Sequence, residues 1–196
     1  VLEYLLRDQV EAGRVDFRVI DGLTIENRAE QLKSIPDDVL EEIKKCHVTL
    51  KGPTHTPERG DGWPNIESAN VSMRKELDLF ANVRPVRLPS QGIDWTFFRE
   101  NTEGEYAPVG GRLYPGTAHE TVVQTNMFTR RGTERIIRAA FEFCVRRNKG
   151  NKVTSVTKSN AQSFGMVFWD EVFTEVAAEF PQIETESLLV DRAAMD

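Results

Sequence analysis

Three arginines, a serine and an asparagine occur at spacings that suit the binding of an acidic small molecule. The segment Ser68-Ala69-Asn70-Val71-Ser72-Met73-Arg74 is followed by Arg84, and Arg99 opens the run Arg99-Glu100-Asn101-Thr102-Glu103-Gly104-Glu105-Tyr106. A guanidinium group holds a carboxylate through two parallel hydrogen bonds, which the ammonium group of a lysine cannot do. Three arginines in this pattern therefore predict a ligand with more than one carboxylate.

The composition is that of a globular enzyme. The 196 residues suffice for one ordinary domain or for parts of two, with 39% hydrophobic and 29% charged residues. The formal net charge of −6 argues against nucleic acid and anionic membranes as partners. No apolar run is long enough to predict a membrane span. Cys46 and Cys144 have no motif spacing, so we expect reduced thiols in the protein core.

Short β-prone runs alternate with helical patterns, which indicates an α/β architecture. The predicted strands cover residues 15–20, 47–50, 82–88, 94–99, 152–157 and 185–190. The predicted helices begin at Pro36, near residue 68, at residue 130 and near residue 165, and the last three end near residues 80, 148 and 180. Residues 51–67 are rich in Gly and Pro and predict a loop, whereas residues 104–127 predict a hairpin-like arm. Residues 1–6 are typical of the middle of a helix and residues 190–196 of a first helical turn, so we expect an internal part of a longer protein.

Each candidate residue also has a purely structural interpretation. Ser68 is suited to capping a surface helix, and Arg99 to an ion pair with Glu100 or Glu103. Lys158 follows the β-prone run 152–157, where a lysine is costly to bury without a partner or a task. Asp191 suits either a helix N-cap or a metal ligand.

Taken together, the pattern Ser-x-Asn-x-x-x-Arg, the arginine ten residues later and the run Arg-Glu-Asn-Thr-Glu-Gly-Glu-Tyr resemble the substrate-binding segments of one family. This is the isocitrate/isopropylmalate dehydrogenase family, the metal-dependent decarboxylating dehydrogenases of 2-hydroxy acids. The resemblance implies that Tyr106 is a general acid, and a tyrosine with a pKa near its reference value of about 10 keeps its proton at neutral pH. It also implies that the substrate carboxylates are bound by Ser68, Asn70, Arg74, Arg84 and Arg99.

Three further segments resemble parts of the same family. Thr157-Lys158-Ser159-Asn160 is similar to a segment whose lysine reaches the active site of the partner subunit and helps to remove the hydroxyl proton, with Asn160 near the nicotinamide. Lys51-Gly52-Pro53-Thr54-His55-Thr56 is similar to the loop that approaches the cofactor, which implies cofactor contacts by Lys51 and Thr56. Asp191 is similar to the aspartate that is donated across the dimer to a divalent metal ion.

The resemblance implies a two-domain α/β fold of which this sequence holds a part. Residues 1–79 would belong to the first, cofactor-side domain, and residues 80–196 to the second domain, with a β clasp arm at about 104–127. The implied cofactors are NAD or NADP and Mg²⁺ or Mn²⁺. The implied assembly is a cytoplasmic homodimer, or a mitochondrial one in a eukaryote, with an active site shared between subunits. We expect the glycine-rich opening strand to precede Val1 and the remaining metal aspartates to follow Asp196, so this chain alone would be inactive.

The substrate expected from the resemblance is isocitrate, which would be converted to 2-oxoglutarate. Ser68 and Asn70 are polar where an isopropylmalate enzyme is expected to present apolar groups, and a polar pair suits a third carboxylate. The runs 109–112, 128–132 and 158–171 are more similar to D-malate or tartrate dehydrogenases, so these substrates stay open beside 3-isopropylmalate. A non-catalytic regulatory subunit, which would be expected to lose Tyr106 or Lys158, and a metal-independent ligand-binding fragment are alternatives of another class.

Overall fold

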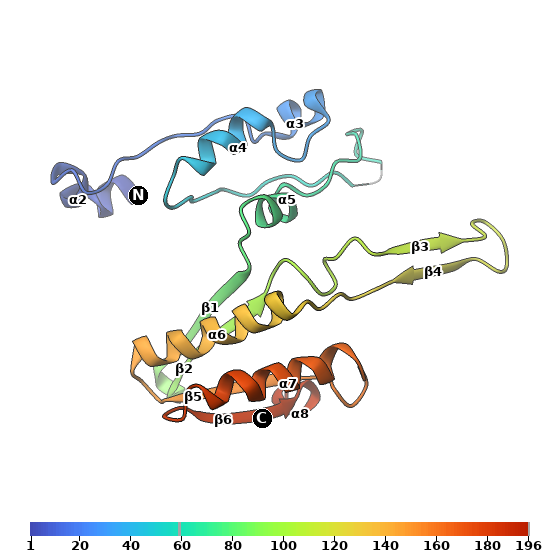
Figure 1. The fold of residues 1–196 in the computed structure, drawn as a ribbon. Coiled ribbons are helices and arrows are strands. Elements are labelled where there is room, and N and C mark those ends of the chain that lie inside the picture. Colours follow the sequence, from blue (N-terminus) through green and yellow to red (C-terminus); the bar gives the residue numbers. More distant parts are fainter. Residues whose placement is uncertain (59, 196) are drawn as a thin grey trace. The chain divides into compact units, whose positions relative to one another are not determined.

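The fold was obtained as a computed structural model, which describes residues 1–58 and 60–195. The chain forms two compact units, Val1–Leu77 and Asp78–Asp196 (Figure 1). Among the described residues, no helix has both the length and the apolar character needed to cross a membrane.

The first unit is built from short helices joined by extended segments (Figure 1). Its core lies between α4 and α5, where Val39 and Ile43 pack with Ala69 and Met73, and Ile35 completes the cluster. The helices are α1 (Leu2–Leu5), α2 (Arg7–Glu11), α3 (Ile25–Gln31), α4 (Asp37–Lys44) and α5 (Ala69–Glu76). The predicted helices at residues 1–6 and after Pro36 are thus confirmed, with Pro36 itself at the N-cap of α4.

Several sequence predictions for the first unit are wrong. Residues 15–20 and 47–50 are not strands, because no described segment pairs with them and a strand forms only where a neighbour completes its hydrogen bonds. Helix α3 was not expected, although Thr24 caps it by accepting a hydrogen bond from the amide of Asn27 at 3.4 Å. Helix α5 ends at Glu76 instead of near residue 80, because Asp78 adopts a left-handed φ of 46° that no α-helix continues.

In the second unit, two helices pack on paired strands, as predicted for an α/β chain. Strands β1 (Ala81–Leu88) and β2 (Ile93–Glu100) are antiparallel, and a 3-10 turn, η1 (Pro89–Gln91), connects them. Strands β5 (Lys152–Thr157) and β6 (Glu184–Leu189) are parallel. Helix α7 (Gly165–Ala178) connects β5 to β6, and the short α8 (Val190–Ala193) follows directly after β6.

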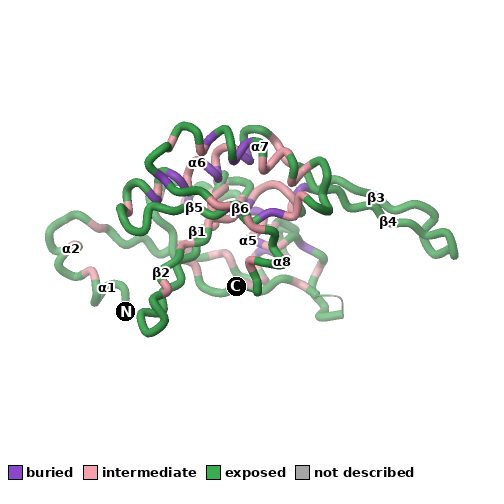
Figure 2. The backbone as a smooth tube through the Cα atoms, turned by 90° about the horizontal axis from the view of Figure 1, so that it is seen from below, coloured by how far each residue is buried: buried purple, intermediate pink, exposed green. Residues whose placement is uncertain are grey.

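The core of this unit lies between α6 (Arg130–Arg147) and α7. Ile136 and Phe141 of α6 meet Val172, Phe173 and Val176 of α7, and all five side chains are buried. Figure 2 shows buried positions along both helices. The predicted apolar stripe of α6 is nearly correct, since Ile136 and Cys144 are buried as expected. The two thiols are free.

The predicted arm at residues 104–127 contains an antiparallel hairpin. Strands β3 (Gly110–Leu113) and β4 (Thr121–Gln124) pair from Gly110 opposite Gln124 to Leu113 opposite Thr121. Every residue of both strands is exposed (Figure 2). Such a hairpin gains little stability by itself, because it buries almost no apolar surface.

The basic face of α6 is a network of ion pairs. Arg138 reaches Glu179 at 2.7 Å and Glu134 at 3.0 Å, and Arg130 pairs with Glu134 and Glu175. These contacts support a solvated, charge-balanced surface instead of a nucleic-acid site, which agrees with the net charge of −6.

Candidate active site

Arg84 and Arg99 lie on one face of the β1–β2 ladder. In the antiparallel register Asn82 is opposite Arg99 and Arg84 is opposite Phe97. Side chains of alternate residues point to the same side of a strand, so Arg84 and Arg99 are diagonal neighbours. Arg84 Nε donates to Asn82 Oδ1 at 3.0 Å, which aligns this arginine along the strand. The two positively charged groups thus share one surface.

Arg99 and Tyr106 are in direct contact. Arg99 Nη2 donates to Tyr106 Oη at 2.8 Å and to a carboxylate oxygen of Glu105 at 2.7 Å. Bonding to Tyr106, and then to Glu105, raises the pKa of Arg99. The expected structural partners Glu100 and Glu103 are not the ones that Arg99 uses. In this bond the phenol oxygen of Tyr106 is the acceptor and uses one of its lone pairs.

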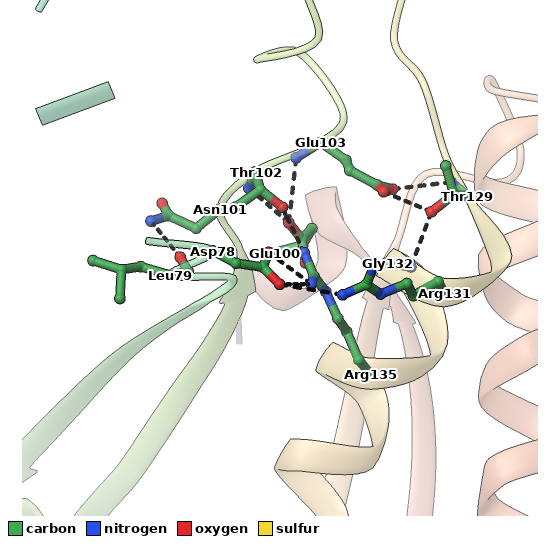
Figure 3. Close-up of polar contacts among 10 residues, drawn as sticks. All are labelled: Asp78, Leu79, Glu100, Asn101, Thr102, Glu103, Thr129, Arg131, Gly132 and Arg135. Atoms are coloured by element: carbon green, nitrogen blue, oxygen red, sulfur yellow. Dashed lines mark hydrogen bonds and ion pairs between the residues drawn. The ribbon is translucent and has the colours of Figure 1, made fainter. Parts of the chain in front are cut away.

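The segment between Arg99 and Tyr106 is held to the rest of the unit at Glu100 and Thr102 (Figure 3). Glu100 accepts from the Thr102 amide at 2.6 Å and from the Glu103 amide at 3.2 Å. Arg135 of α6 donates to Thr102 Oγ1 at 2.7 Å and to both carboxylate oxygens of Asp78, at 2.8 and 2.9 Å. This network ties the end of β2 to helix α6.

Glu103 fastens the same segment to the N-terminus of α6 (Figure 3). Its carboxylate accepts from the Thr129 amide at 2.9 Å and from Thr129 Oγ1 at 2.6 Å. Thr129 is the N-cap of α6 and accepts from the Gly132 amide at 3.0 Å. A Cβ atom at residue 132 would overlap the Glu103 carboxylate, so only glycine leaves room for it. An anionic group is favourable here because the helix N-terminus carries partial positive charge.

Lys158 and Asp191 meet at the carboxyl ends of β5 and β6. Because these strands are parallel, with Thr157 opposite Leu189, the residues that follow them emerge at the same edge. Lys158 Nζ donates to Asp191 Oδ2, and this bond lowers the pKa of Asp191. The side chains are 34% and 65% exposed, so both can reach a ligand. Asp191 is not an N-cap, because Leu189 occupies that position.

The described residues do not assemble a complete metal centre. They contain no group of three or more His, Cys, Asp or Glu side chains arranged to hold a metal ion. Asp191 is an ionised, exposed carboxylate of the kind that Mg²⁺ and Mn²⁺ bind. Asp191 therefore suits the role of one metal ligand, and a complete metal site would need further ligands that these residues do not supply.

In the first unit, the start of α5 and the loop before it come together. Ser68 is the N-cap of α5, but its hydroxyl makes no capping bond and instead accepts from Thr56 Oγ1 at 3.4 Å. Ser68 thus occupies the N-cap position without the side-chain bond that a structural serine cap normally makes. Asn70 and Arg74 both belong to α5, four residues apart, and lie on one helical face.

The remaining predicted residues have only local contacts. Lys51 Nζ donates to the Gly52 carbonyl at 2.7 Å. Asn160 is exposed in the turn after β5. Within the described parts, the structure thus brings together Thr56 with Ser68, Arg84 with Arg99, Arg99 with Tyr106, and Lys158 with Asp191. The residues that hold these pairs in place were not predictable from local sequence patterns. Glu100, Glu103 and Arg135 hold them through contacts with residues far away in the sequence.

The chain is similar to known proteins along most of its length. The family model described as isocitrate/isopropylmalate dehydrogenase matches residues 5–196. The chain is 35% identical over 195 residues to D-malate dehydrogenase (decarboxylating) of Escherichia coli strain K12, across 90% of this chain and 52% of that protein. It is 31% identical over 188 residues to tartrate dehydrogenase/decarboxylase of Pseudomonas putida, across 90% of this chain and 51% of that protein.

Solved structures show the same similarity. The crystal structure of isocitrate dehydrogenase from Methylococcus capsulatus superposes with a TM-score of 0.72 at 32% sequence identity, across 88% of this chain and 51% of that one. The chain therefore spans about half the length of the relatives that it matches. The predicted fold is confirmed, and the chain belongs to the isocitrate/isopropylmalate dehydrogenase family.

Proposed function

We propose that the protein containing this chain catalyses the NAD- or NADP-dependent oxidative decarboxylation of a 2-hydroxy acid, with Mg²⁺ or Mn²⁺. The first candidate reaction is isocitrate to 2-oxoglutarate. The observation that supports the proposal is the hydrogen bond between Arg99 and Tyr106, because a phenol that would donate a proton then lies beside a guanidinium that would bind a carboxylate. The chain belongs to a family of decarboxylating dehydrogenases, and this membership supports the roles proposed for Arg99 and Tyr106.

The arginines would bind and orient the acid. Arg84 and Arg99 share one face of β1–β2, and both are at least partly exposed to a ligand. Ser68, Asn70 and Arg74 at the start of α5 would hold the remaining polar substituent. Binding the acid through several of its carboxylates would fix its orientation relative to the cofactor. Orientation of bound reactants contributes a large share of the rate acceleration by enzymes.

Proton transfer is assigned to Lys158 and Tyr106. A base relay through Lys158 would carry away the proton of the substrate hydroxyl, and Asp191, to which Lys158 is hydrogen-bonded, would be a metal ligand and not a member of that relay. Tyr106 would donate its phenol proton to the carbon that has lost CO₂. A divalent cation held by Asp191 would lower the pKa of the substrate hydroxyl, and the nicotinamide, near Lys51, Thr56 and Asn160, would accept the hydride.

A homodimer is part of the proposal. Lys158 and Asp191 are exposed at one edge of β5–β6, which suits donation to the active site of a partner subunit. The β3–β4 hairpin, with all its residues exposed, suits the intersubunit clasp of residues 104–127. The presence of Tyr106 and Lys158 favours an enzyme over a regulatory subunit.

D-malate or tartrate is the second candidate substrate class. The curated relatives named above are a D-malate and a tartrate dehydrogenase. The polar Ser68 and Asn70 favour the third carboxylate of isocitrate, and the similarity to an isocitrate dehydrogenase structure agrees with that choice. 3-Isopropylmalate would leave these two polar groups against an alkyl substituent, which is unfavourable.

The test uses the longest reading frame that contains this chain, called the full-length protein below. Formation of reduced nicotinamide would be measured with Mn²⁺, each of NAD and NADP, and isocitrate, D-malate, tartrate or 3-isopropylmalate. The proposal predicts turnover of one acid, with isocitrate giving the highest kcat/KM. A higher value for D-malate or tartrate would move the assignment to that substrate, and no turnover of any acid would favour the regulatory subunit.

A further inference from the structure

Arg28 of α3 is a charged side chain with no exposed surface. Its guanidinium binds three backbone carbonyls: Nε donates to Ser34 at 2.7 Å, Nη1 to His55 at 2.7 Å and Nη2 to Glu67 at 3.0 Å. Each nitrogen that donates thus serves a different segment of the first unit. None of these partners carries a formal charge.

Burial of the charged Arg28 side chain is unfavourable, so its three hydrogen bonds must offset part of the free energy lost by removing it from water. Removing a charged group from water costs several kcal/mol in proteins, which is comparable with the net free energy of unfolding of a domain. Carbonyl dipoles compensate for this cost less than a carboxylate would. Burial lowers the pKa of Arg28, but an arginine keeps its charge at neutral pH. Arg28 donates from three separate nitrogens fixed in one plane, whereas the three N–H groups of a lysine ammonium extend from a single nitrogen, so lysine cannot reproduce these three bonds.

Two of the three carbonyls belong to residues that directly precede proposed site residues. The His55 carbonyl forms the peptide bond to Thr56, and the Glu67 carbonyl forms the peptide bond to Ser68. The hydroxyls of Thr56 and Ser68 are themselves 3.4 Å apart. Arg28 therefore fixes the two peptide units from which these side chains extend.

The chain between the two peptides does not replace this connection. Residues 57–67 form no helix or strand among the residues described there. Their inner contacts centre on Asp61, which accepts from the amides of Glu58 at 2.7 Å and Trp63 at 3.0 Å and lies 3.1 Å from His55. These bonds shape the loop within itself, whereas Arg28 joins both of its ends to α3.

We propose that Arg28 is a positioning residue that sets the spacing between Thr56, on the cofactor side, and Ser68, on the substrate side. The inference rests on the proposed function, in which Thr56 meets the nicotinamide and Ser68 the acid. Hydride transfer depends steeply on the approach of these two partners, and a misplacement of about 1 Å can lower a rate about 100-fold. Arg28 would thus act on the rate of the chemical step without touching either partner.

The experiment compares Arg28→Lys with Val39→Ala in the full-length protein. Val39 is a buried core residue of the same unit and takes no part in the three Arg28 hydrogen bonds, so Val39→Ala lowers thermal stability while these bonds stay in place. Arg28→Lys is expected to lower kcat at least about tenfold and to change the KM of the acid less than about threefold, because orientation suffers more than affinity. The kinetic isotope effect with the C2-deuterated acid is expected to rise, as hydride transfer becomes rate-limiting.

Hydrogen exchange provides a readout that does not depend on turnover. Arg28→Lys is expected to speed amide exchange at residues 55–58 and 67–70 together. Val39→Ala is expected to leave residues 55–58 at the rate of the unsubstituted protein, because Val39 packs with Ala69 but its cluster contains no residue of 55–58. Equal kcat and isotope effects in the two variants, at equal loss of Tm, would show that Arg28 serves stability alone and would overturn the inference. Absence of turnover by the unsubstituted protein would instead overturn the proposed function, and the inference with it.

Discussion

For single residues, the contact between Arg99 and Tyr106 would join the proposed anion binding to the proposed proton donation. The Arg99 substitution to lysine keeps the charge but loses the planar fork. We expect Arg99→Lys to raise the KM of the acid about 10- to 100-fold, because a hydrogen bond to a charged group is worth about 1.5–3 kcal/mol. Steady-state kinetics of the full-length protein would measure this. Arg87→Lys is the matched control on β1, where the side chain is exposed and belongs to no proposed site.

Tyr106 permits a second test at the same scale. Tyr106→Phe removes the proposed proton donor and keeps the ring, so we expect kcat to fall by about 10²–10⁴, the usual contribution of general acid catalysis. The KM of the acid should change much less. Tyr114→Phe, in the exposed arm, is the control and should match the unsubstituted protein. An unchanged kcat in Tyr106→Phe would remove the tyrosine from the mechanism.

The candidate residues themselves were easier to predict from the sequence than the residues that hold them in position. Arg99 and Tyr106 are seven positions apart, so their contact follows from a short local segment. The groups that hold this segment come from far away in the sequence, such as Arg135, which lies 33 residues beyond its partner Thr102. Arg28 likewise donates a hydrogen bond to a carbonyl 39 residues away, and no local sequence pattern predicts such a contact. The catalytic and binding roles themselves stay predictions.

At the scale of elements, the N-terminus of α6 and the segment that carries Tyr106 depend on one carboxylate. Gly132→Ala would push Glu103 away from Thr129, so the loss of charge-assisted bonds, about 1.5–3 kcal/mol, exceeds the gain of up to about 1 kcal/mol in helix propensity. We expect a net loss of about 1–2 kcal/mol in the free energy of unfolding, measured by urea unfolding.

A double-mutant cycle makes this prediction specific. In the Glu103→Ala background the obstacle is gone, so Gly132→Ala is expected to be neutral or to stabilise the protein by up to about 1 kcal/mol. Additive effects of the two substitutions would contradict the capping role of Glu103. The cycle therefore separates the clash from any general effect of alanine in α6.

Most elements were predictable because their signals are local. The helix α6 has a clear apolar periodicity and ends at Asn148 in a left-handed conformation, with φ of 48°. The runs 15–20 and 47–50 have β propensity but no described partner, and propensity alone does not make a strand. The short α3 was missed because seven residues carry too little periodicity.

At the scale of the whole molecule, ion pairs connect elements throughout the chain. Four glutamates among the described residues have pKa values below the usual range: Glu42 through Lys45, Glu179 through Arg138, Glu186 through Lys152, and Glu67 through Lys75 and then Ser72. A carboxyl group whose pKa is lower in the folded state stabilises the fold above its unfolded pKa of about 4.3. That contribution is lost as the pH falls below this value and through the folded pKa.

We therefore expect the free energy of unfolding to be nearly constant above about pH 5 and to fall steadily below about pH 4. Urea unfolding of the full-length protein at a series of pH values would measure the slope. The double variant Glu179→Gln/Glu186→Gln should show a shallower slope, because it lacks two of these carboxyl groups. The same slope in both proteins would assign acid sensitivity to other residues.

We propose that the protein containing this chain couples the oxidation of a 2-hydroxy acid to the loss of CO₂. One experiment tests this coupling: the ratio of CO₂ released to nicotinamide reduced by the full-length protein is measured with isocitrate, first with Mn²⁺ and again after chelation of the metal. We expect a ratio of one with Mn²⁺ and no reaction after chelation. Reduction of the cofactor without release of CO₂, or equal activity without a divalent metal, would refute the proposed reaction.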